Sequence, residues 1–279
     1  MSILDRERNA EFGVFGAMSI DELRKRFLNS DTLPPDDVLN ALENDPRAGV
    51  RQIASNIRRR REKEIKESAR LENLLCFEKA LWSEGFHNIA GVDEAGIGPL
   101  AGPVVAAAVI LPRGCKINGL NDSKKISRHG DREELESRIK KTACNWAIGR
   151  AEAEEIDRLN IYRAGILAMR RAVEGLDTPP DYLLVDARTI TEYSCPQRGI
   201  VKGDALSMSI AAASILAKTC RDRVMLEMDA LYPGYGLSAH KGYPTAEHLN
   251  ALQRLGPSPI HRRSYGPVRA TAQGYFKEL

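Results

Sequence analysis

Residues 89–110 read IAGVDEAGIGPLAGPVVAAAVI, and this stretch decides the fold. Its apolar start predicts a short strand over Asn88–Val92, and the apolar, β-branched run over Pro103–Leu111 predicts a second strand. Between the two runs stand two adjacent carboxylates, Asp93 and Glu94, followed by glycines. The order of strand, bend and strand predicts that a sheet begins here.

The two carboxylates can serve one centre only under a geometric condition. Adjacent side chains on a strand point to opposite faces, so Asp93 and Glu94 converge only where the strand ends or bends. The glycines that follow supply such a bend, and they also let a ligand approach the backbone closely. Taken alone, the pair is also compatible with a charged turn between two strands.

The same turn matches a second pattern, because Gly96 to Ala101 fits the G-x-G-x-x-A fingerprint of dinucleotide-binding folds. That fingerprint requires a helix directly after the glycines, whose N-terminus holds a pyrophosphate. Here Gly102 and Pro103 intervene and a predicted strand follows. The upstream carboxylates would also repel a phosphate unless a metal ion neutralised them, so we disfavour this interpretation.

Strands and helices alternate along the rest of the chain. Helical spacing is found over Asp131–Thr142, Ile161–Val173, Ala205 to about Leu231 and Thr245–Leu255, and strand-like runs are found over Trp146–Ala153, Tyr182–Val185 and Ile200–Val201. Such alternation predicts an α/β fold in which a mixed sheet is flanked by helices.

Residues 1–75 have a different pattern. Apolar residues recur at helical spacing, and a break at Asn44–Arg47 precedes a second helical run over about 50–83. That run contains Arg58–Arg61 among few apolar positions, which indicates an exposed helix. We therefore expect a helical N-terminal extension over residues 1–75, and a main domain over residues 76–279 that includes a C-terminal helical segment.

Composition excludes several classes of protein. The net charge of +3, from 41 basic and 38 acidic residues among 279, does not by itself indicate a nucleic-acid binder. Five cysteines without a C-x-x-C pair argue against a disulfide framework and against a zinc ribbon. No segment has the roughly 20 apolar residues needed to span a bilayer. We expect a cytoplasmic protein without membrane attachment.

Two further carboxylates stand at the ends of predicted elements. Asp186 follows the buried strand Tyr182–Val185, and Asp204 stands where an approach strand meets the long helix. Either residue alone is more often a turn residue or a helix N-cap. Jointly with Asp93 and Glu94, they indicate several carboxylates at one edge of a sheet, which is the oxygen-rich ligand set that hard divalent cations prefer.

At this point the sequence resembles a known family, that of ribonuclease HII. The resemblance rests on motifs that occur in family order between about residues 88 and 268. These are Asp93 to Val109, Asp122-Ser123-Lys124-Lys125, Leu183 to Ala187, Lys202-Gly203-Asp204, Ser209 to Lys218 with Arg221-Asp222-Arg223, His240 to Thr245, and Gly256-Pro257 to His261-Arg262. The N-terminal segment is similar to an extension that some bacterial members carry.

The resemblance implies an RNase H-like fold and an endonuclease that hydrolyses the RNA strand of RNA–DNA hybrids. It also implies cleavage 5′ of ribonucleotides embedded in duplex DNA, which leaves 5′-phosphate and 3′-hydroxyl ends. The four carboxylates that would bind two divalent ions, Mg²⁺ or Mn²⁺, and act in catalysis fall on Asp93, Glu94, Asp186 and Asp204. The enzyme is expected to act as a monomer.

The resemblance also implies a set of substrate-binding residues. Gly96 and Gly98, with Ile97 between them, would present backbone groups to the ribose 2′-hydroxyl, which distinguishes RNA from DNA. Tyr243 would stack on the deoxyribose after the ribonucleotide, although packing in the core is its alternative role. Candidates for phosphate contacts, each of which could also be an ordinary surface residue, are Ser123, Lys124, Lys202, Lys218 and Arg221.

Ile97 departs from the family pattern. The family turn normally reads Gly-Arg-Gly, whereas this chain has Gly96-Ile97-Gly98. The glycines should keep their backbone contacts, but a guanidinium that could fork onto a phosphate is missing. We expect a weakened enzyme, most clearly on a single embedded ribonucleotide, unless a nearby basic residue such as Lys124 fills the vacancy.

Two functions from other classes stay open at this point. One is a non-catalytic module that binds hybrids, although a binder of polyanions gains nothing from four carboxylates. The other is a nuclease of the same superfold with a DNA substrate, such as a junction resolvase. The glycine turn and Tyr243 favour recognition of a ribonucleotide over both alternatives.

Overall fold

The computed structural model describes residues 15–30, 32–120 and 129–272. The chain divides into two compact units, Met1–Arg70 and Leu71–Leu279. Ser123 and Lys124, two of the candidates for phosphate contacts, lie outside the described residues. In the part of the chain that is described, no helix is both long enough and apolar enough to cross a membrane.

The N-terminal unit is built from helices α2 (Ile20–Phe27), α3 (Asp36–Glu43) and the start of α4 (Ala48–Leu74). Ser19 begins α2 with a capping box, in which its side chain accepts from the backbone N–H of Glu22 and the Glu22 carboxylate accepts in return. The apolar faces of the helices share one small core, which contains Leu23, Phe27, Leu39, Leu42, Val50, Ile53 and Ile57.

The arginines of α4 are engaged with this same unit. Arg58 donates to both carboxylate oxygens of Glu43, at 2.6 and 2.8 Å. Arg60 donates to the carbonyl of Ser30, and Arg61 pairs with Asp36. Three members of the arginine run therefore have partners within the N-terminal unit, although their side chains keep some exposure to solvent.

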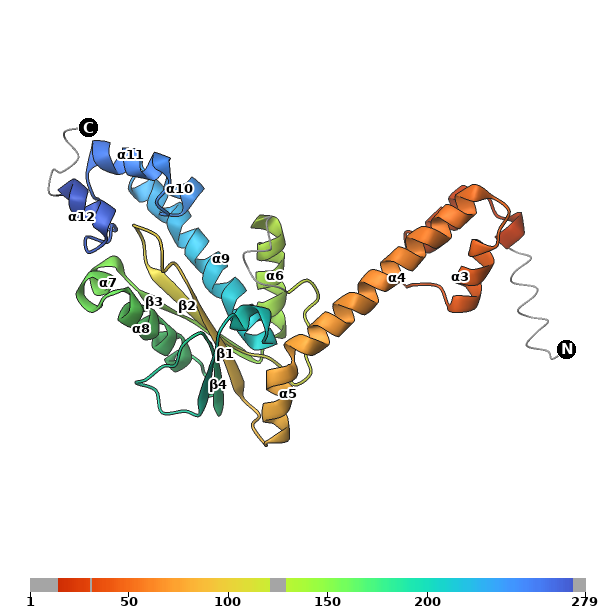
Figure 1. The fold of residues 1–279 in the computed structure, drawn as a ribbon, viewed down its shortest axis with the longest axis horizontal. Coiled ribbons are helices and arrows are strands. Elements are labelled where there is room, and N and C mark those ends of the chain that lie inside the picture. Colours follow the sequence, from red (N-terminus) through yellow and green to blue (C-terminus); the bar gives the residue numbers. More distant parts are fainter. Residues whose placement is uncertain (1–14, 31, 121–128, 273–279) are drawn as a thin grey trace. The chain divides into compact units, whose positions relative to one another are not determined.

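The second unit is organised around one five-stranded sheet of order β3-β2-β1-β4-β5 (Figure 1). Its strands are β1 (Ile89–Ala95), β2 (Val104–Ile110), β3 (Asn145–Ala151), β4 (Tyr182–Asp186) and β5 (Gln197–Ile200). The pairs β1–β2 and β2–β3 are antiparallel, whereas β1–β4 and β4–β5 are parallel. The predicted mixed sheet flanked by helices is confirmed.

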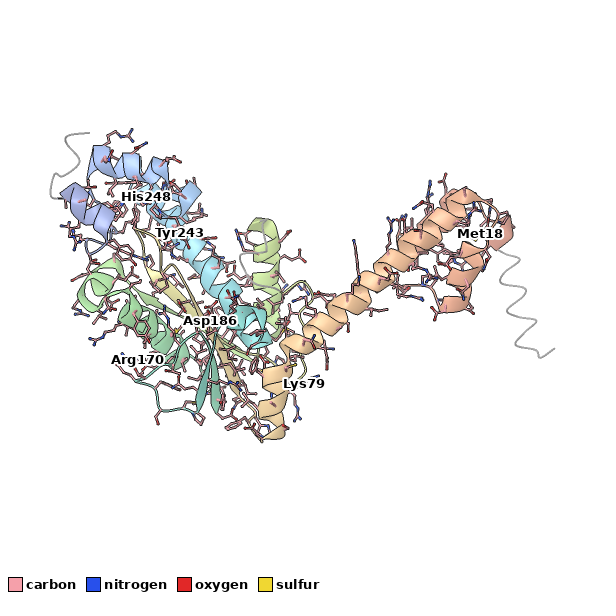
Figure 2. The ribbon with its side chains drawn as sticks, viewed as in Figure 1. Met18, Lys79, Arg170, Asp186, Tyr243 and His248 are labelled. Atoms are coloured by element: carbon pink, nitrogen blue, oxygen red, sulfur yellow. The ribbon has the colours of Figure 1, made fainter. Side chains whose placement is uncertain are left out.

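Helices cover both faces of the sheet. One face packs against α5 (Cys76–Ser83), α6 (His129–Thr142) and α9 (Met208–Leu231), and the other face packs against α7 (Ala153–Leu159) and α8 (Ile161–Glu174). The C-terminal end of α9 shares a third core with α10 (Leu237–His240), α11 (Ala246–Leu255) and α12 (Gly266–Ala272) (Figures 1 and 2).

Some boundaries differ from the sequence prediction. Strand β1 continues through Ala95, so the two carboxylates are among the last residues of the strand and do not follow it. Ala153 begins a helix that the sequence pattern assigned to a strand. The long helix starts at Met208 with Ser207 as its N-cap, after a short 3₁₀ turn over Gly203–Ala205.

A glycine brings α9 against the sheet. A Cβ atom on Gly91 would lie 2.0 Å from the backbone carbon of Ser209, so any side chain at this position would push the helix away. Because α9 rests directly on β1, its residues one and two turns further on, Ser214 and Lys218, reach the edge where β1 ends.

Candidate active site

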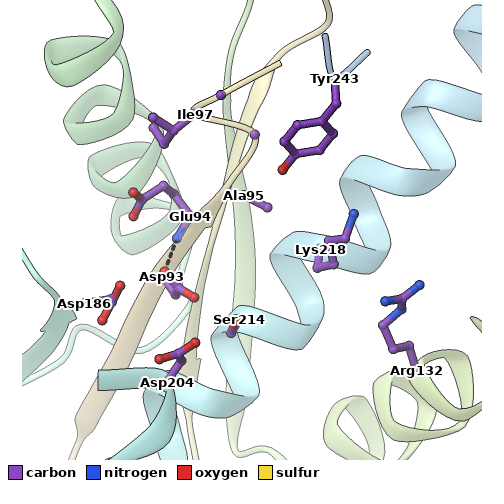
Figure 3. A pocket seen from close by; sticks show the side chains of 12 residues that line it. Asp93, Glu94, Ala95, Ile97, Arg132, Asp186, Asp204, Ser214, Lys218 and Tyr243 are labelled. Atoms are coloured by element: carbon purple, nitrogen blue, oxygen red, sulfur yellow. Dashed lines mark hydrogen bonds between the residues drawn. The ribbon is translucent and has the colours of Figure 1, made fainter. Parts of the chain in front are cut away.

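A cavity of about 270 Å³ opens at the carboxyl end of β1. Four acidic residues line one side of it, and we call them the acidic edge: Asp93, Glu94, Asp186 and Asp204. Two cationic residues, Arg132 and Lys218, stand on the opposite side, and Tyr243 stands near the glycines (Figure 3). The remaining lining residues are Ala95, Gly96, Ile97, Gly98 and Ser214.

Asp93 and Glu94 reach the cavity from opposite faces of the strand, as their adjacency requires. Asp93 accepts a hydrogen bond from Ser214 on α9. Glu94 turns toward the α8 face, where its Oε1 atom lies 3.4 Å from Nη2 of Arg188. The cavity receives both carboxylates because it wraps around the end of β1.

Asp186 and Asp204 are tied together by the backbone between them. Asp186 ends β4, and its Oδ1 atom accepts from the backbone N–H of Gly203 at 2.6 Å. That bond fixes the 3₁₀ turn in which the next residue, Asp204, lies buried. A strand end and a helix start thus meet at one point, as the sequence pattern predicts.

Crowding of the carboxylates has an electrostatic cost. Burial raises the pKa of Asp93 well above its usual range, and the neighbouring charges of Glu94 and Asp186 raise it further. A cation placed among these groups would relieve the repulsion and favour their ionised forms. The acidic edge therefore has the electrostatics of a cation site.

The donor set fits a hard divalent cation, since every candidate ligand is a carboxylate oxygen. Among the described residues, no three His, Cys, Asp or Glu side chains are already arranged around a common point. The reason is visible in their present partners. Asp93 accepts from the backbone N–H of Glu94 at 2.7 Å, Asp186 accepts from Gly203, and Glu94 faces Arg188. An ion bound here would have to replace these partners at the carboxylate oxygens.

The cationic side of the cavity is held by a buried acid. Asp222 is 2% exposed, pairs with Lys218 one turn away on α9, and lies 3.9 Å from Arg132 of α6. Lys218 was a sequence candidate for phosphate contact, and the structure places it on the cavity wall. Arg132 was missed, because nothing along the sequence separates it from the other charges of its helix.

Arg221 requires a correction. It was a candidate for phosphate contact, but its side chain is fully buried and donates to the backbone carbonyls of Ala101, Pro103 and Lys241. Burial, followed by the nearby charge of Arg262, lowers the pKa of Arg221 to about 10. This guanidinium is a structural brace and does not reach the cavity.

The turn over residues 96–103, here called the glycine turn, is braced by a second buried arginine. Arg262 donates to the carbonyls of Gly96, Ile97 and Gly102, at 2.6 to 3.0 Å. Gly96 has φ +98°, and a Cβ atom there would lie 2.2 Å from Nε of Arg221. A residue other than glycine at position 96 would therefore strain the backbone and displace the brace.

The remaining candidates for substrate binding lie at different positions around the cavity. A Cβ atom on Gly98 would lie 3.7 Å from the ring of Tyr243, so the two residues are neighbours on the cavity wall, and the ring is 42% exposed. Ile97 contributes to the cavity wall and packs toward Gly165 of α8. Lys202 is exposed next to the acidic edge, in a left-handed conformation with φ 59°.

This sheet order, with helices on both faces, is that of the RNase H-like class of proteins. Ribonuclease H2 from Pyrococcus horikoshii OT3 superposes with a TM-score of 0.57 at 24% identity, over 68% of this chain and 99% of that chain. Bst-RNase HIII in complex with Mn²⁺ superposes with a TM-score of 0.51 at 16% identity, over 69% of this chain and 71% of that chain.

Sequence comparison gives the family. The profile described as Ribonuclease HII matches residues 90–268, and the profile described as Ribonuclease HII N-terminal domain matches residues 19–82. Ribonuclease HII of Myxococcus xanthus is 61% identical over 251 residues, which is 90% of this chain and 86% of that protein. Ribonuclease HII of Desulfitobacterium hafniense (strain Y51) is 52% identical over 252 residues, or 90% and 95% of the two chains.

The chain therefore belongs to the ribonuclease HII family. It is an endoribonuclease that cleaves the RNA strand of RNA–DNA hybrids, and enzymes of this family work with divalent metal ions. The family resemblance seen in the sequence motifs is confirmed.

Proposed function

We propose that the acidic edge is the catalytic centre and that it holds two divalent ions, Mg²⁺ or Mn²⁺. The enzyme hydrolyses the phosphodiester on the 5′ side of a ribonucleotide, both in hybrids and at single ribonucleotides in duplex DNA. When bound, such ions activate water and stabilise charge on the attacking and leaving oxygens. The products carry 5′-phosphate and 3′-hydroxyl ends.

One observation carries this proposal, namely the convergence of four carboxylates on one side of a cavity that has two cations opposite. Asp93 and Asp186 bind the metal ions on one side of the cavity. Lys218 and Arg132 bind substrate phosphates on the opposite side. The buried Asp222 keeps both cationic side chains at that wall. The scissile strand would thus lie between an acidic and a basic side.

Recognition of the ribonucleotide comes from the glycine turn and Tyr243. Backbone groups of Gly96 and Gly98 face the cavity, where a ribose 2′-hydroxyl can donate and accept. The half-exposed ring of Tyr243 lies close to Gly98, so a sugar held at the glycine turn can pack against the open part of the ring. A sugar without the 2′-hydroxyl would not form these hydrogen bonds, which disfavours DNA.

The test uses three labelled duplexes, which are an RNA–DNA hybrid, DNA with one embedded ribonucleotide, and all-DNA. Wild-type enzyme with Mg²⁺ or Mn²⁺ should cut the first two, 5′ of the ribonucleotide, and leave the third intact. Asp186→Asn should cut none, whereas Asp177→Asn, an equal charge change at an exposed site, should cut normally.

Other outcomes separate the alternatives. Binding of hybrids without any cleavage would favour a non-catalytic module, and cleavage of the all-DNA duplex would favour a resolvase-like nuclease. Normal cleavage by Asp186→Asn at millimolar Mg²⁺ would refute the assignment of the acidic edge. A monomeric state and a cytoplasmic location remain predictions from the sequence.

A further inference from the structure

Three histidines cluster near Tyr243, and two of them are buried. His248 and His261 are 0% and 1% exposed, and their Nε2 atoms lie 3.1 Å apart. The ring of His240 stacks on that of His248, with centroids 4.4 Å apart. His248 lies close to Tyr243, as Figure 2 shows, and its Nδ1 atom is 2.9 Å from the Tyr243 carbonyl oxygen.

The hydrogen bonds fix which ring nitrogens carry protons. The backbone N–H of Ser258 donates to Nδ1 of His261 at 3.0 Å, so in the neutral ring the proton is on Nε2. That Nε2–H must donate to Nε2 of His248, because a second N–H on His248 facing it at 3.1 Å would be repelled. The proton of His248 is then on Nδ1, and it donates to the carbonyl of Tyr243.

These contacts form a directed chain from one segment to another. It starts at the Ser258 amide, passes through both rings and ends at the Tyr243 carbonyl, which also accepts from the N–H of Thr245 at 2.8 Å. The chain is anchored to the glycine turn, because the next residue after His261 is the buried Arg262 that braces it. The backbone at Tyr243 is thus held from two sides.

We propose that His261 and His248 form a positioning relay that sets the ring of Tyr243 close to Gly98 for contact with the sugar beside the scissile bond. Neither histidine touches the substrate. The role of the relay depends on the contact between Tyr243 and the sugar that is part of the proposed function. The existence of the hydrogen-bonded relay does not depend on that contact. The relay requires His248 in the Nδ1–H form and His261 in the Nε2–H form.

Electrostatics keep the relay neutral. Burial, together with the neighbouring His248, lowers the pKa of His261 to about 4, and burial also lowers the pKa of His248. A proton added to Nε2 of His248 would place two N–H groups against each other between the rings, and a proton added to Nδ1 of His261 would face the Ser258 N–H. Near neutral pH both rings are uncharged, and the directed chain is intact.

The first test detects the relay without substrate. Nitrogen-15 chemical shifts of the five histidine rings in the full chain distinguish protonated from unprotonated ring nitrogens, and each ring is assigned by loss of its signals in a His→Asn variant. The expected pattern near neutral pH is Nδ1–H for His248 and Nε2–H for His261. A His248 ring with its proton on Nε2 would overturn the proposal.

The second test asks whether the relay acts through the tyrosine. His261→Asn should lower kcat/KM on a duplex with one ribonucleotide about two- to tenfold, the value of one hydrogen bond. In a Tyr243→Ala background the same change should have no further effect on cleavage. His87→Asn, at an exposed histidine remote from the relay, should cleave normally in both backgrounds.

The outcomes are separable. An equal loss of kcat/KM in both backgrounds, tracking a loss of thermal stability, would show a merely structural role and overturn the relay's function. If Tyr243→Ala cleaves like the wild type, the placement of Tyr243 on the sugar fails, and the relay's function fails with it. The ring-nitrogen pattern still decides independently whether the relay exists.

Discussion

The acidic edge and the glycine turn lie on the same cavity, but they are built in opposite ways. The acidic edge gathers like charges, so that burial and its neighbours disfavour the ionised form of Asp93. In the glycine turn, the carbonyls of residues 96, 97, 101, 102 and 103 accept from two fully buried arginines, Arg221 and Arg262. The acidic edge holds repulsion that a cation would relieve, whereas the glycine turn is held in place by hydrogen bonds within the protein.

This difference predicts which substitutions lower activity alone and which lower activity and stability together. Replacing a carboxylate of the acidic edge removes repulsion and should leave the fold at least as stable. Replacing a brace of the glycine turn leaves buried carbonyls unsatisfied and should cost stability and activity together.

The largest effect is expected from Asp93→Asn. A neutral amide cannot replace the carboxylate as a cation ligand, so cleavage of a hybrid at millimolar Mg²⁺ should fall roughly a thousandfold or more, as for other essential catalytic groups. The melting temperature in metal-free buffer should equal or exceed that of the wild type. Loss of activity accompanied by a lower melting temperature would contradict the contrast drawn here.

The same variant gives a pH signature. The raised pKa means that the folded state binds the Asp93 proton more tightly than the unfolded chain does. The resulting stability is complete below the unfolded pKa of about 3.9 and is lost as the pH rises through the raised folded value. In metal-free buffer, the stability advantage of Asp93→Asn over the wild type should therefore grow with pH across this window, as measured by urea unfolding at several pH values.

The next largest effect is expected from Arg262→Met, which keeps bulk but removes the guanidinium. Three carbonyls of the glycine turn lose their donor, and at about 1–3 kcal/mol for each unsatisfied group the free energy of unfolding should fall by about 3 kcal/mol or more. Cleavage should decline as well. Arg263→Met, at the exposed neighbour, is the matched control and should change neither quantity measurably.

A smaller effect concerns the missing arginine of the turn. Ile97→Arg should raise cleavage at a single ribonucleotide about tenfold, since a charge-assisted hydrogen bond contributes about 1.5–3 kcal/mol. The gain should be milder on a continuous hybrid, which offers many registers. Unchanged cleavage at the single ribonucleotide would show that the arginine is not limiting.

The effect of Ile97→Arg should depend on the neighbouring residue Arg188. Its guanidinium contacts Glu94, and both Arg188 and Ile97 approach the bare backbone of Gly165. A second guanidinium at position 97 would therefore be repelled by Arg188. The increase from Ile97→Arg should be larger in an Arg188→Gln background, measured as kcat/KM on the same duplex. An identical increase in both backgrounds would show that the two positions do not interact.

The smallest effect is expected from the N-terminal unit. Deletion of residues 1–70 should leave the active-site geometry in place and weaken hybrid binding, with a loss that shrinks as salt rises because phosphate contacts release counterions. The internal pairing of Arg58, Arg60 and Arg61 reduces the charge they can offer and makes this the mildest prediction. An equal loss at low and high salt would indicate a folding role for the unit.

The sequence by itself indicated the strands, the glycine turn that follows β1 and the four carboxylates near element ends, although several bounds differ from those predicted. These features depend on neighbours along the chain, such as the apolar runs that form β1 and β4 and the glycines that follow them. Because the ends of parallel strands meet at one edge of a sheet, local pattern was enough to place Asp93 near Asp186.

Only the tertiary structure decided which basic side chains face the cavity. Lys218 and Arg221 are three residues apart on α9, yet Lys218 lines the cavity and Arg221 is buried under the glycine turn. The same holds for Arg132, Arg188 and the histidine relay, whose partners lie many residues away. The physical reason is that charge and spacing are written along the chain, whereas burial and hydrogen-bond partners arise when distant segments pack together.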